Sequence, residues 1–394
     1  MSMREIIARA VASLPPPSRL TGRVAHLALS GGVDSSVAGF LLRERGWDVR
    51  PVLMRCWADA DDAETGTSCF TKELRAAESA VKALKLERRL SVFDFVAEYW
   101  TNVFQDVLLA GLEAGDTPNQ DLACNAFIKF GSFPRRLAEE TSSVESPPFA
   151  TGHYARIDLG LPEGRVRLLR AVDPVKDQTY FLATVPNDAL RHAMFPVGGL
   201  LKKDVREIAA HVGLPAAQQK SSRGICFVGR RKKAAFIERY MVGHRRSEKG
   251  GQGSFVRVDT TEQMAPLAMP AYAYTIGQRA RIGGQPQAFY VVGRLGNDIL
   301  VSSSKLVVAD AICEKPVWLT GSAPAELQGR RSRMRLQYKS CSSAVPNWCT
   351  VTHYCEGRLK VCFEVPEEAR SAGQFLVFYK GEEVLGSAII SRHN

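Results

Sequence analysis

A glycine pair between a short apolar run and an amphipathic helix pattern constrains the fold more than any other feature of the chain. Residues 24–30 have the composition of a buried strand, Gly31 and Gly32 follow as a turn, and residues 35–45 repeat apolar side chains with a helical period. A second apolar strand pattern follows at residues 49–54. A strand, a helix and a strand in this order form a βαβ unit, with the glycine turn at the carboxyl end of its first strand.

The alternation of helices and short apolar segments continues along the chain. Helix patterns at residues 72–84, 96–114 and 125–140 are separated by apolar segments at 90–93 and 149–152. A parallel sheet with helices on both faces requires this order. The sequence therefore predicts the α/β fold class, with a doubly wound parallel sheet.

Changes in composition divide the rest of the chain. A basic run at residues 230–233 precedes a glycine-rich stretch of weak periodicity, and short alternating segments from about residue 306 predict a small antiparallel barrel. The predicted domains are a possible import presequence (1–23), an α/β nucleotide-binding domain (24–232), a small central domain (233–305) and a C-terminal β-barrel domain (306–394).

The charge balance and the cysteines limit the class of function. Lysine and arginine number 52 against 41 aspartates and glutamates, a formal charge of +11, which attracts polyanions such as nucleic acid. Many soluble proteins are basic without binding nucleic acid, so charge alone leaves both interpretations open. The nine cysteines include no C-x-x-C pair, which favours a reducing compartment. No apolar run approaches the roughly 20 residues of a membrane span, so no membrane partner is expected.

The N-terminal segment supports two interpretations. Residues 1–23 are rich in arginine, contain the single acid Glu5 and carry an apolar stripe, as an amphipathic organelle-import presequence does. The same stripe is typical of a surface helix that ends at the prolines of residues 15–17. The composition leaves both open.

The loop at residues 30–36, SGGVDSS, has the composition of a phosphate-binding loop. Its glycines let backbone amides approach a phosphate, and its serines and the helix N-terminus add donors. It lacks the lysine of a Walker A loop, which disfavours a simple phosphate-hydrolysing NTPase. It instead resembles the pyrophosphate loop of the N-type ATP pyrophosphatases, which cleave ATP to AMP and pyrophosphate. In such a loop we expect Asp34 to fix the loop or its counterion rather than to act as a base.

A second motif, TPNQDLACN at residues 117–125, leads into a helix. Asn119 or Asp121 can cap that helix and so place Cys124 in or near its first turn, where the helix dipole favours a thiolate. A reactive cysteine and a buried structural cysteine are both compatible with this motif.

A third motif places Cys226 between Gly224 and Gly229, directly before the basic run at residues 230–233. Flanking glycines favour an accessible segment, and the positive charges lower a thiol pKa and attract a phosphate backbone. Taken alone, Cys226 is also compatible with a structural cysteine.

In this order, the three motifs resemble those of the tRNA-specific 2-thiouridylase family, which thiolates the wobble uridine, with the greatest likeness to its mitochondrial branch. The resemblance covers nearly the whole chain. Further matching stretches lie at residues 150–156, 176–182, 195–199, 274–279 and 373–379.

The resemblance implies an ATP-dependent tRNA-uridine 2-sulfurtransferase. ATP would convert the C2 oxygen of the uridine at position 34 to an adenylate, because that oxygen is a poor leaving group. Cys226 would carry a persulfide whose terminal sulfur attacks C2, giving 2-thiouridine, AMP and pyrophosphate. Cys124 would free the sulfur by forming a disulfide with Cys226, or would attack the base itself, and Asp121 would take a proton or steer the base. A disulfide needs α-carbons within about 7 Å of each other, so the Cys226 segment would have to move.

The resemblance also implies two sets of binding residues. Those for ATP, with Mg²⁺ as the expected ion, are Ala28, Leu29, Ser30, Gly31, Gly32, Val33, Asp34, Ser35, Met54 and Gly152. Those for tRNA are Asn119, Gln120, Asp121, His153, Lys176, Asp177, Gln178, Arg335, Leu336 and Gln374.

The same cysteines support a competing chemistry. Asp121, Cys124 and Cys226 could instead ligate an iron–sulfur cluster with one open iron site. The family likeness further implies wobble-uridine tRNAs of the Lys, Glu and Gln type, an upstream persulfide donor in a cysteine desulfurase relay, and a mitochondrial location, with a cytoplasmic one as the alternative.

Some positions depart from the family pattern. Gln120 replaces the usual proline before Asp121, Ser221 replaces an acidic residue, and Lys72-Glu73 replaces an acidic pair after Cys69.

Two other functions compete with the sulfurtransferase interpretation. One is an amidating ligase with the same phosphate loop, in which the cysteines would have no catalytic role. The other is a tRNA-binding protein that has lost catalysis.

Overall fold

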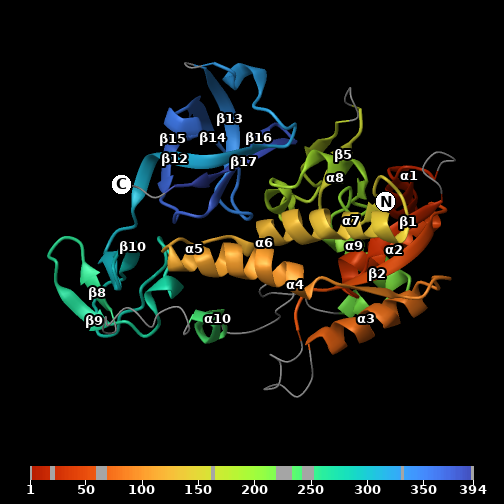
Figure 1. The fold of residues 1–394 in the computed structure, drawn as a ribbon, viewed down its shortest axis with the longest axis horizontal. Helices are drawn as coiled ribbons and strands as arrows, with labels where there is room; N and C mark the ends of the chain where they lie inside the picture. The colour runs from red at the N-terminus through yellow and green to blue at the C-terminus, as the bar shows by residue number, and fades with distance from the viewer. Residues whose placement is uncertain are drawn as a thin grey trace.

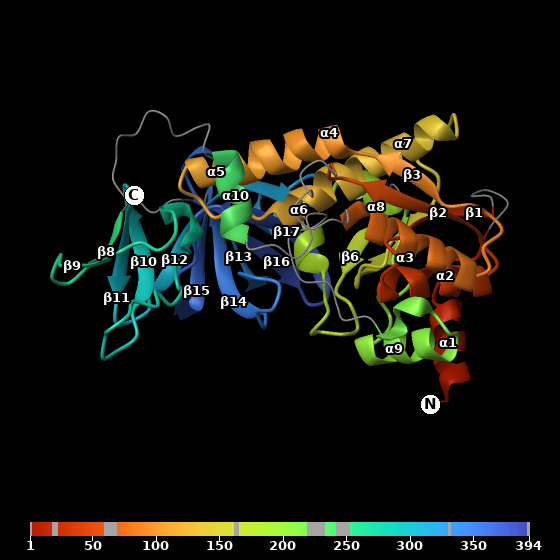
Figure 2. The same ribbon diagram turned by 90° about the horizontal axis from the view of Figure 1, so that it is seen from below.

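The computed structural model of the chain describes residues 2–17, 23–58, 69–160, 165–218, 233–241, 253–329 and 332–391. Figure 2 shows a parallel-sheet domain at one end, a barrel next to it and a small sheet at the far end. Among the described residues, no helix is long and apolar enough to cross a membrane.

The first domain is built on a five-stranded parallel sheet in the order β3-β2-β1-β4-β7. The strands are β1 Val24–Ala28, β2 Asp48–Arg55, β3 Ser91–Asp94, β4 Phe149–Ala150 and β7 Ala193–Met194. The chain runs outward from β1 to β3 and then returns to β4 on the other side of β1. The carboxyl ends of β1 and β4 therefore form the topological switch point, where doubly wound sheets bind their ligands. This confirms the predicted fold class.

Helices cover both faces of this sheet (Figure 1). One face packs on α1, α2, α3 and α9, which share a core with Leu27 and Leu53, while Ala28 and Met54 face the opposite core. The alternation follows from the strand period of two. The bounds are α1 Met3–Ala12, α2 Val33–Glu44, α3 Cys69–Ala83, α8 Asn187–Arg191, α9 Lys202–His211, η5 Thr179–Leu182 and η6 Pro215–Gln218.

Two long helices cover the second face, and each contains a π-helical middle. The first runs through α4 Val96–Tyr99, η2 Trp100–Leu109 and α5 Ala110–Glu113. The second runs through α6 Gln120–Ala123, η3 Cys124–Ser132 and α7 Phe133–Glu140. The helices predicted at 96–114 and 125–140 are confirmed, although the second begins five residues earlier than predicted, at the cap formed by Asn119.

The C-terminal domain is a closed antiparallel barrel in the order β12-β15-β14-β13-β16-β17, which β12 and β17 close. Alternate side chains, among them Leu336, Val351 and Phe378, fill its interior. The predicted antiparallel barrel is confirmed. The strands are β12 Val307–Trp318, β13 Arg333–Lys339, β14 Asn347–His353, β15 Leu359–Glu368, β16 Phe375–Lys380 and β17 Glu383–Ile390, with the 3₁₀ turns η8 Ala325–Leu327 and η9 Cys355–Gly357.

The barrel and the first domain share a sheet, which the sequence did not predict. A hairpin of the first domain, β5 Arg156–Asp158 and β6 Arg167–Leu169, pairs with the start of β17 through Leu168 and Leu169. β12 covers only the later part of β17, from Gly386 onward. The hairpin therefore covers an edge that the barrel leaves open.

The central region forms a four-stranded sheet in the order β10-β11-β8-β9, with its own small core. Its elements are β8 Ser254–Arg257, β9 Gln263–Pro266, β10 Tyr290–Leu295, β11 Asp298–Ser302 and η7 Ala271–Ala273. α10 Lys233–Met241, which begins at the predicted domain boundary, packs instead on the first domain (Figure 2). There Phe236 and Tyr240 contact Trp57 and Phe104 in one aromatic cluster.

The N-terminal stripe is packed into the first domain. Ile6, Ala10 and Leu14 are buried in the core beneath α2 and α9. The carbonyl groups of Leu14 and Pro15 accept hydrogen bonds from the side chains of Arg45 and Trp47, at 2.9 and 3.0 Å. This is the packing expected of a surface helix that ends at the proline run.

Candidate active site

The phosphate loop, residues 30–36, lies at the switch point directly after β1. Gly31 has a φ of 73°, and a Cβ there would lie 2.5 Å from the carbonyl carbon of Ala76 in α3, so only glycine fits. The hydroxyls of Ser35 and Ser36 donate to the Gly32 carbonyl at 3.1 and 2.9 Å. α2 then begins with no side chain capping its first amides, which leaves them for an anion.

Asp34 is held in this loop by two side chains from distant segments. The hydroxyl of Tyr154 donates to Asp34 Oδ1 at 2.8 Å, and Lys202 Nζ donates to the same oxygen. Burial and the neighbouring Asp34 charge raise the pKa of Tyr154, so it remains a protonated donor. The geometry agrees with the interpretation that Asp34 fixes the loop.

Residues from the two neighbouring strands complete the crevice. Met54 is the next-to-last residue of β2 and is buried, and Gly152 lies two residues after the end of β4. A Cβ at Gly152 would lie 2.6 Å from the backbone nitrogen of Ser35, so the two loops touch through their backbones. The structure therefore brings the predicted ATP-binding residues together at one edge of the sheet.

The cysteine loop, residues 116–124, enters the second long helix. Asn119 Oδ1 accepts from the Asp121 amide at 3.2 Å, so Asn119 is the cap, and Cys124 follows one turn into the helix. The Cys124 side chain is fully buried, in the same core as Ala28 and Met54. Cys124 therefore lies in the core on the sheet face of Ala28 and Met54, whereas Val33 of the phosphate loop belongs to the opposite core.

The barrel fixes the start of the cysteine loop. The amide of Thr117 donates to the Ala372 carbonyl at 2.8 Å, and the Gln374 side chain donates to the Thr117 carbonyl at 2.5 Å. Gly373 has a φ of 84°, and a Cβ there would lie 2.9 Å from Asp116 Cβ. Gln374, predicted to contact tRNA, therefore also holds the loop that leads to Cys124.

Two further predicted tRNA residues lie beside Gly152. His153 packs against Phe130 of the Cys124 helix at 5.8 Å between ring centroids, and its Nδ1 lies 2.8 Å from Thr151 Oγ1. Burial and the charge of Lys129 hold the His153 pKa well below its usual value, so the ring is neutral at physiological pH. Gln178 pairs with the backbone of Tyr154 through two hydrogen bonds of 2.9 Å.

Asp177 lies inside the protein, whereas its neighbour Lys176 is partly exposed. Its carboxylate accepts from the Thr179 hydroxyl at 2.7 Å and lies 3.5 Å from both Arg170 and Lys339. Lys339 belongs to β13, and burial lowers its pKa. The cluster joins the first domain to the barrel. Sequence reasoning missed Lys339, because it lies 162 residues from Asp177 in the chain, and it did not single out Arg170.

Of the two strand residues of the barrel predicted to contact tRNA, one side chain is exposed and the other is buried. Arg335 is on the outer face, with a two-pronged hydrogen bond to Glu364 at 2.6 and 2.9 Å and its guanidinium 4.0 Å from the Trp348 ring centroid. The Leu336 side chain points into the barrel core and is 1% exposed, so only its backbone can face a ligand.

Cys226 and the basic run up to residue 232 lie outside the described residues, as does Ser221. The described cysteines form no disulfide with one another, and the described residues contain no cluster of three or more potential metal ligands. The persulfide and cluster hypotheses both need Cys226 and therefore stay predictions.

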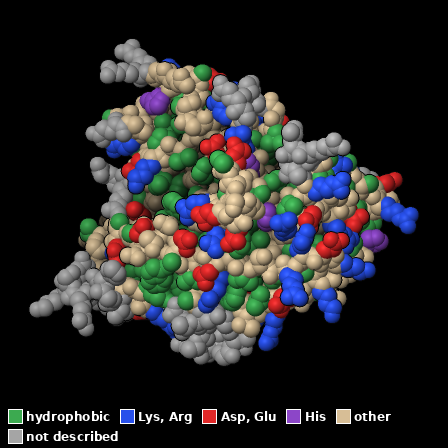
Figure 3. Space-filling view, turned by 45° about the vertical axis from the view of Figure 1, so that its right-hand side comes forward, with side chains coloured by type: hydrophobic (Ala, Val, Ile, Leu, Met, Phe, Trp, Pro, Cys, Tyr) green, Lys and Arg blue, Asp and Glu red, His purple; other side chains and the backbone are tan. Residues whose placement is uncertain are grey.

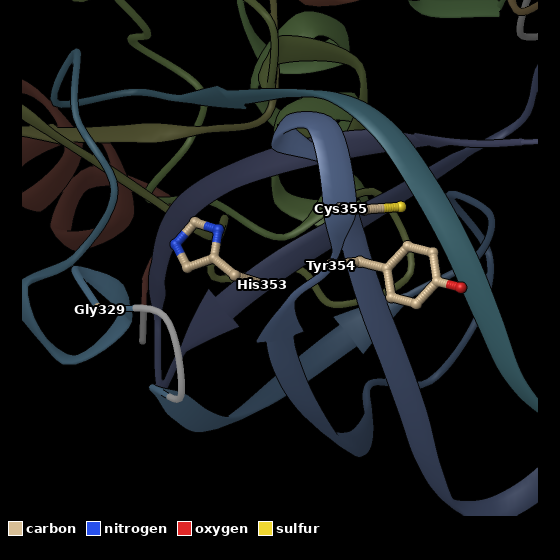
Figure 4. A pocket seen from close by; sticks show the side chains of 4 residues that line it. All are labelled: Gly329, His353, Tyr354 and Cys355. Atoms are coloured by element: carbon tan, nitrogen blue, oxygen red, sulfur yellow. The ribbon is translucent and has the colours of Figure 1, made fainter.

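Neither the described pocket nor the surface charge identifies the candidate active site. A pocket of about 490 Å³ on the barrel is lined by Gly329, His353, Tyr354 and Cys355, none of which was predicted to function (Figure 4). On the face drawn in Figure 3, lysine and arginine side chains alternate with acidic ones rather than forming one basic patch.

Comparisons with known proteins identify relatives over almost the whole chain. Residues 23–230 match the family model of the tRNA methyl transferase HUP domain, and residues 309–390 that of the aminomethyltransferase β-barrel domain. Curated relatives named tRNA-specific 2-thiouridylase MnmA, from Shigella flexneri serotype 5b (strain 8401) and Escherichia coli (strain K12 / DH10B), are each 35% identical over 385 residues, which cover 94% of this chain and 98% of theirs.

Solved structures show weaker similarity. A structure titled U34-tRNA thiolase NcsA from Methanococcus maripaludis with its 4Fe-4S cluster is 15% identical and covers 62% of this chain and 75% of that one, with a TM-score of 0.37. A 4-thiouridine synthetase–RNA complex with bound ATP is 18% identical and covers 50% and 42%, with a TM-score of 0.32. These scores are too low to transfer a site or a ligand.

Proposed function

This chain belongs to the tRNA-specific 2-thiouridylase family, and we propose that it is a tRNA sulfurtransferase that uses ATP to convert a uridine of tRNA to 2-thiouridine. The observation that supports this most is that the segment after β4 contacts both motifs: Gly152 touches Ser35 of the phosphate loop, and His153 packs on Phe130 of the Cys124 helix. The phosphate loop follows β1, and Cys124 lies in the core that contains the strand residues Ala28 and Met54. An amidating ligase would need the first loop and would leave the second without a function.

The reaction requires two displacements. The C2 oxygen of uridine attacks the α-phosphorus of ATP, and the bond to pyrophosphate breaks. Sulfur then attacks C2, and AMP leaves with the former oxygen. The phosphate loop supplies amides and hydroxyls for the phosphates, and Mg²⁺ accompanies ATP as the neutralising ion.

We assign the sulfur transfer to two cysteines. Cys226 carries a persulfide, and its terminal sulfur forms the bond to C2. The Cys124 thiolate then attacks the Cys226 Sγ, which breaks the S–S bond, leaves the sulfur on the base and joins the cysteines as a disulfide. An external thiol must reduce that disulfide before the next turnover. Asp121, one helical turn before Cys124, takes the proton or steers the base.

The substrate and the sulfur source follow from the family likeness. The target is the wobble uridine at position 34 of Lys, Glu and Gln type tRNAs, and a persulfide relay from a cysteine desulfurase charges Cys226. Asn119, Gln120 and Asp121, at the start of the helix that carries Cys124, are the proposed base contacts, and His153, which packs on the same helix, is a proposed RNA contact. The partly exposed Lys176 and the exposed Arg335 are the proposed phosphate contacts.

The iron–sulfur alternative uses Asp121, Cys124 and Cys226 as ligands. Asp121 and Cys124 stand three residues apart on one helix, so their side chains can reach a common centre. Iron analysis and visible absorption of protein purified without oxygen decide between the schemes. A cluster predicts bound iron that Cys226→Ser removes, whereas the persulfide route predicts full activity in iron-free protein.

Mass spectrometry of nucleosides tests the proposed function. Unmodified tRNA is incubated with the protein, ATP, a cysteine desulfurase with cysteine as the persulfide donor, and a thiol reductant. Wild type is expected to form 2-thiouridine, and both Cys226→Ser and Cys124→Ser to form none. Cys341→Ser is a suitable control, because Cys341 is a partly exposed barrel cysteine. AMP and pyrophosphate without a thiolated base, even with a competent donor, would instead indicate an amidating or ligating enzyme.

The location of the protein stays a prediction. A mitochondrial location is proposed from the arginine-rich N-terminal stripe and the family likeness. Imaging a fluorescent protein fused behind residues 1–23 tests it, and a cytoplasmic signal would contradict it.

A further inference from the structure

Lys202 lies beside the phosphate loop, although 168 residues separate it from Asp34 in the sequence. It begins α9, and its backbone amide donates to Asp173 Oδ2 at 2.8 Å, which fixes the start of that helix. Its side chain is 14% exposed, so most of it is enclosed by protein. Its ammonium group donates to Asp34 Oδ1 and lies 5.5 Å from the ring centroid of Tyr154.

The charge of Asp34 presents a difficulty for the proposed ATP site. Asp34 lies in the first turn of α2, whose open amides are the proposed anion site. A triphosphate brings several negative charges to that position, and an uncompensated carboxylate in the same loop would repel them. Tyr154 offers Asp34 a hydrogen bond but no charge. Lys202 supplies the positive charge that contacts Asp34 directly, and Arg206 adds a second positive charge near Tyr154.

We propose that Lys202 is a positioning residue for the ATP-dependent step, which compensates the charge of Asp34 and fixes its carboxylate so that the phosphate loop accepts a triphosphate. Lys202 acts through Asp34 rather than on the substrate. The inference rests on the proposed function, because it requires ATP to bind at the phosphate loop. No pattern in the sequence marks Lys202, since its neighbour Lys203 carries the same charge and is exposed.

A double-mutant cycle tests whether Lys202 acts through Asp34. The dissociation constant of α,β-methylene-ATP is measured by equilibrium dialysis for wild type, Lys202→Met, Asp34→Asn and the double variant. Lys202→Met is expected to weaken binding at least about tenfold, which corresponds to about 1.4 kcal/mol. In the Asp34→Asn background the same change is expected to alter binding less than about twofold, because no carboxylate charge is left to compensate.

Two controls separate charge from position. Lys203→Met makes the same substitution one residue along, on an exposed side chain, and is expected to leave binding within about twofold of wild type. Lys202→Arg keeps the positive charge and is expected to retain most of the affinity. tRNA affinity, measured by filter binding, is expected to be equal in all of these variants.

Three outcomes would overturn the proposal. The first is wild-type affinity for the analogue in Lys202→Met, and the second is an equal loss of affinity in Lys203→Met. The third is the same loss of affinity from Lys202→Met in the Asp34→Asn background, which would show that Lys202 acts on the phosphates directly. If Lys202→Met alone does not fold, the affinity of Asp34→Asn for the analogue is compared with that of the double variant. The double variant lacks both charges and so leaves neither side chain uncompensated. Unequal affinities of these two variants overturn the proposal. Failure of the wild type to bind the analogue would refute the ATP step of the proposed function itself.

Discussion

The phosphate loop and the cysteine loop are held in place by different means. Much of the shape of the phosphate loop comes from its own residues, since Gly32, Ser35 and Ser36 hydrogen-bond to one another within a few positions. The cysteine loop receives its starting geometry from the barrel, through Ala372 and Gln374, which lie more than 250 residues further along the chain. We infer that the phosphate loop is shaped largely by its own residues and completed by Tyr154 and Lys202 of the same domain, whereas the cysteine loop depends on the docking of a second domain.

The largest effect on activity is expected at the phosphate loop. Gly31→Ala places a methyl group against the backbone of α3 and adds about 1–2 kcal/mol of left-handed strain. We expect a loss of AMP formation of more than about 100-fold, or about 2.7 kcal/mol in the barrier, with little change in tRNA affinity. Gly213→Ala is the matched control, because Gly213 has a φ of 69° with nothing near its Cβ position. Equal losses in the two variants would show that strain alone is responsible.

The junction between the domains is the next test. Asp177→Ala leaves Arg170 and Lys339 without their buried partner and is expected to lower the free energy of unfolding by about 3–5 kcal/mol. Urea unfolding measures it, with the exposed Asp188→Ala as the control. Unchanged stability together with weakened tRNA binding would instead make Asp177 an RNA contact that becomes exposed.

Gln374 distinguishes holding the cysteine loop from binding RNA. Gln374→Ala removes one hydrogen bond to the Thr117 carbonyl, and we expect kcat to fall by up to about tenfold, as a net contribution of about 0.5–1.5 kcal/mol allows. The Kd for tRNA should remain within about twofold of wild type. Gln328→Ala, which removes a local hydrogen bond on the barrel surface, is the control. A tenfold weaker Kd with unchanged kcat would contradict the positioning role.

The smallest effect near neutral pH is expected on folding stability and comes from His26 in β1, the strand that precedes the phosphate loop. Burial, assisted by the charge of Arg50, lowers the pKa of His26 to about 4. Because the unfolded chain binds this proton and the folded chain does not, stability is fully present above about pH 6.5 and falls as the pH drops toward 4, by up to about 1.4 kcal/mol per pH unit.

Urea unfolding at several pH values, with His26→Leu beside wild type, tests this dependence. The variant should lose less stability on acidification than wild type. An identical slope would assign the acid sensitivity to other groups, such as His153, whose pKa is also lowered.

The difference between the loops also explains what could be predicted from the sequence. The parallel sheet and the glycine turn between its first strand and helix follow from residues that are neighbours in the chain, and this fold prediction is confirmed. The roles of Lys202, Lys339 and Gln374 depend on which distant segments meet. Leu336 shows the same limit, because a match to a family motif identifies a position and does not say whether its side chain points outward.

The shared strand β17 has a consequence for how this protein can be divided. Its first residues pair with β6 of the nucleotide-binding domain and its later ones with β12 of the barrel. A fragment cut between the predicted domains would therefore carry an uncovered strand edge, open to pairing with another copy. The first domain and the barrel are therefore expected to be moved into another enzyme, or deleted, only together, because one sheet spans both.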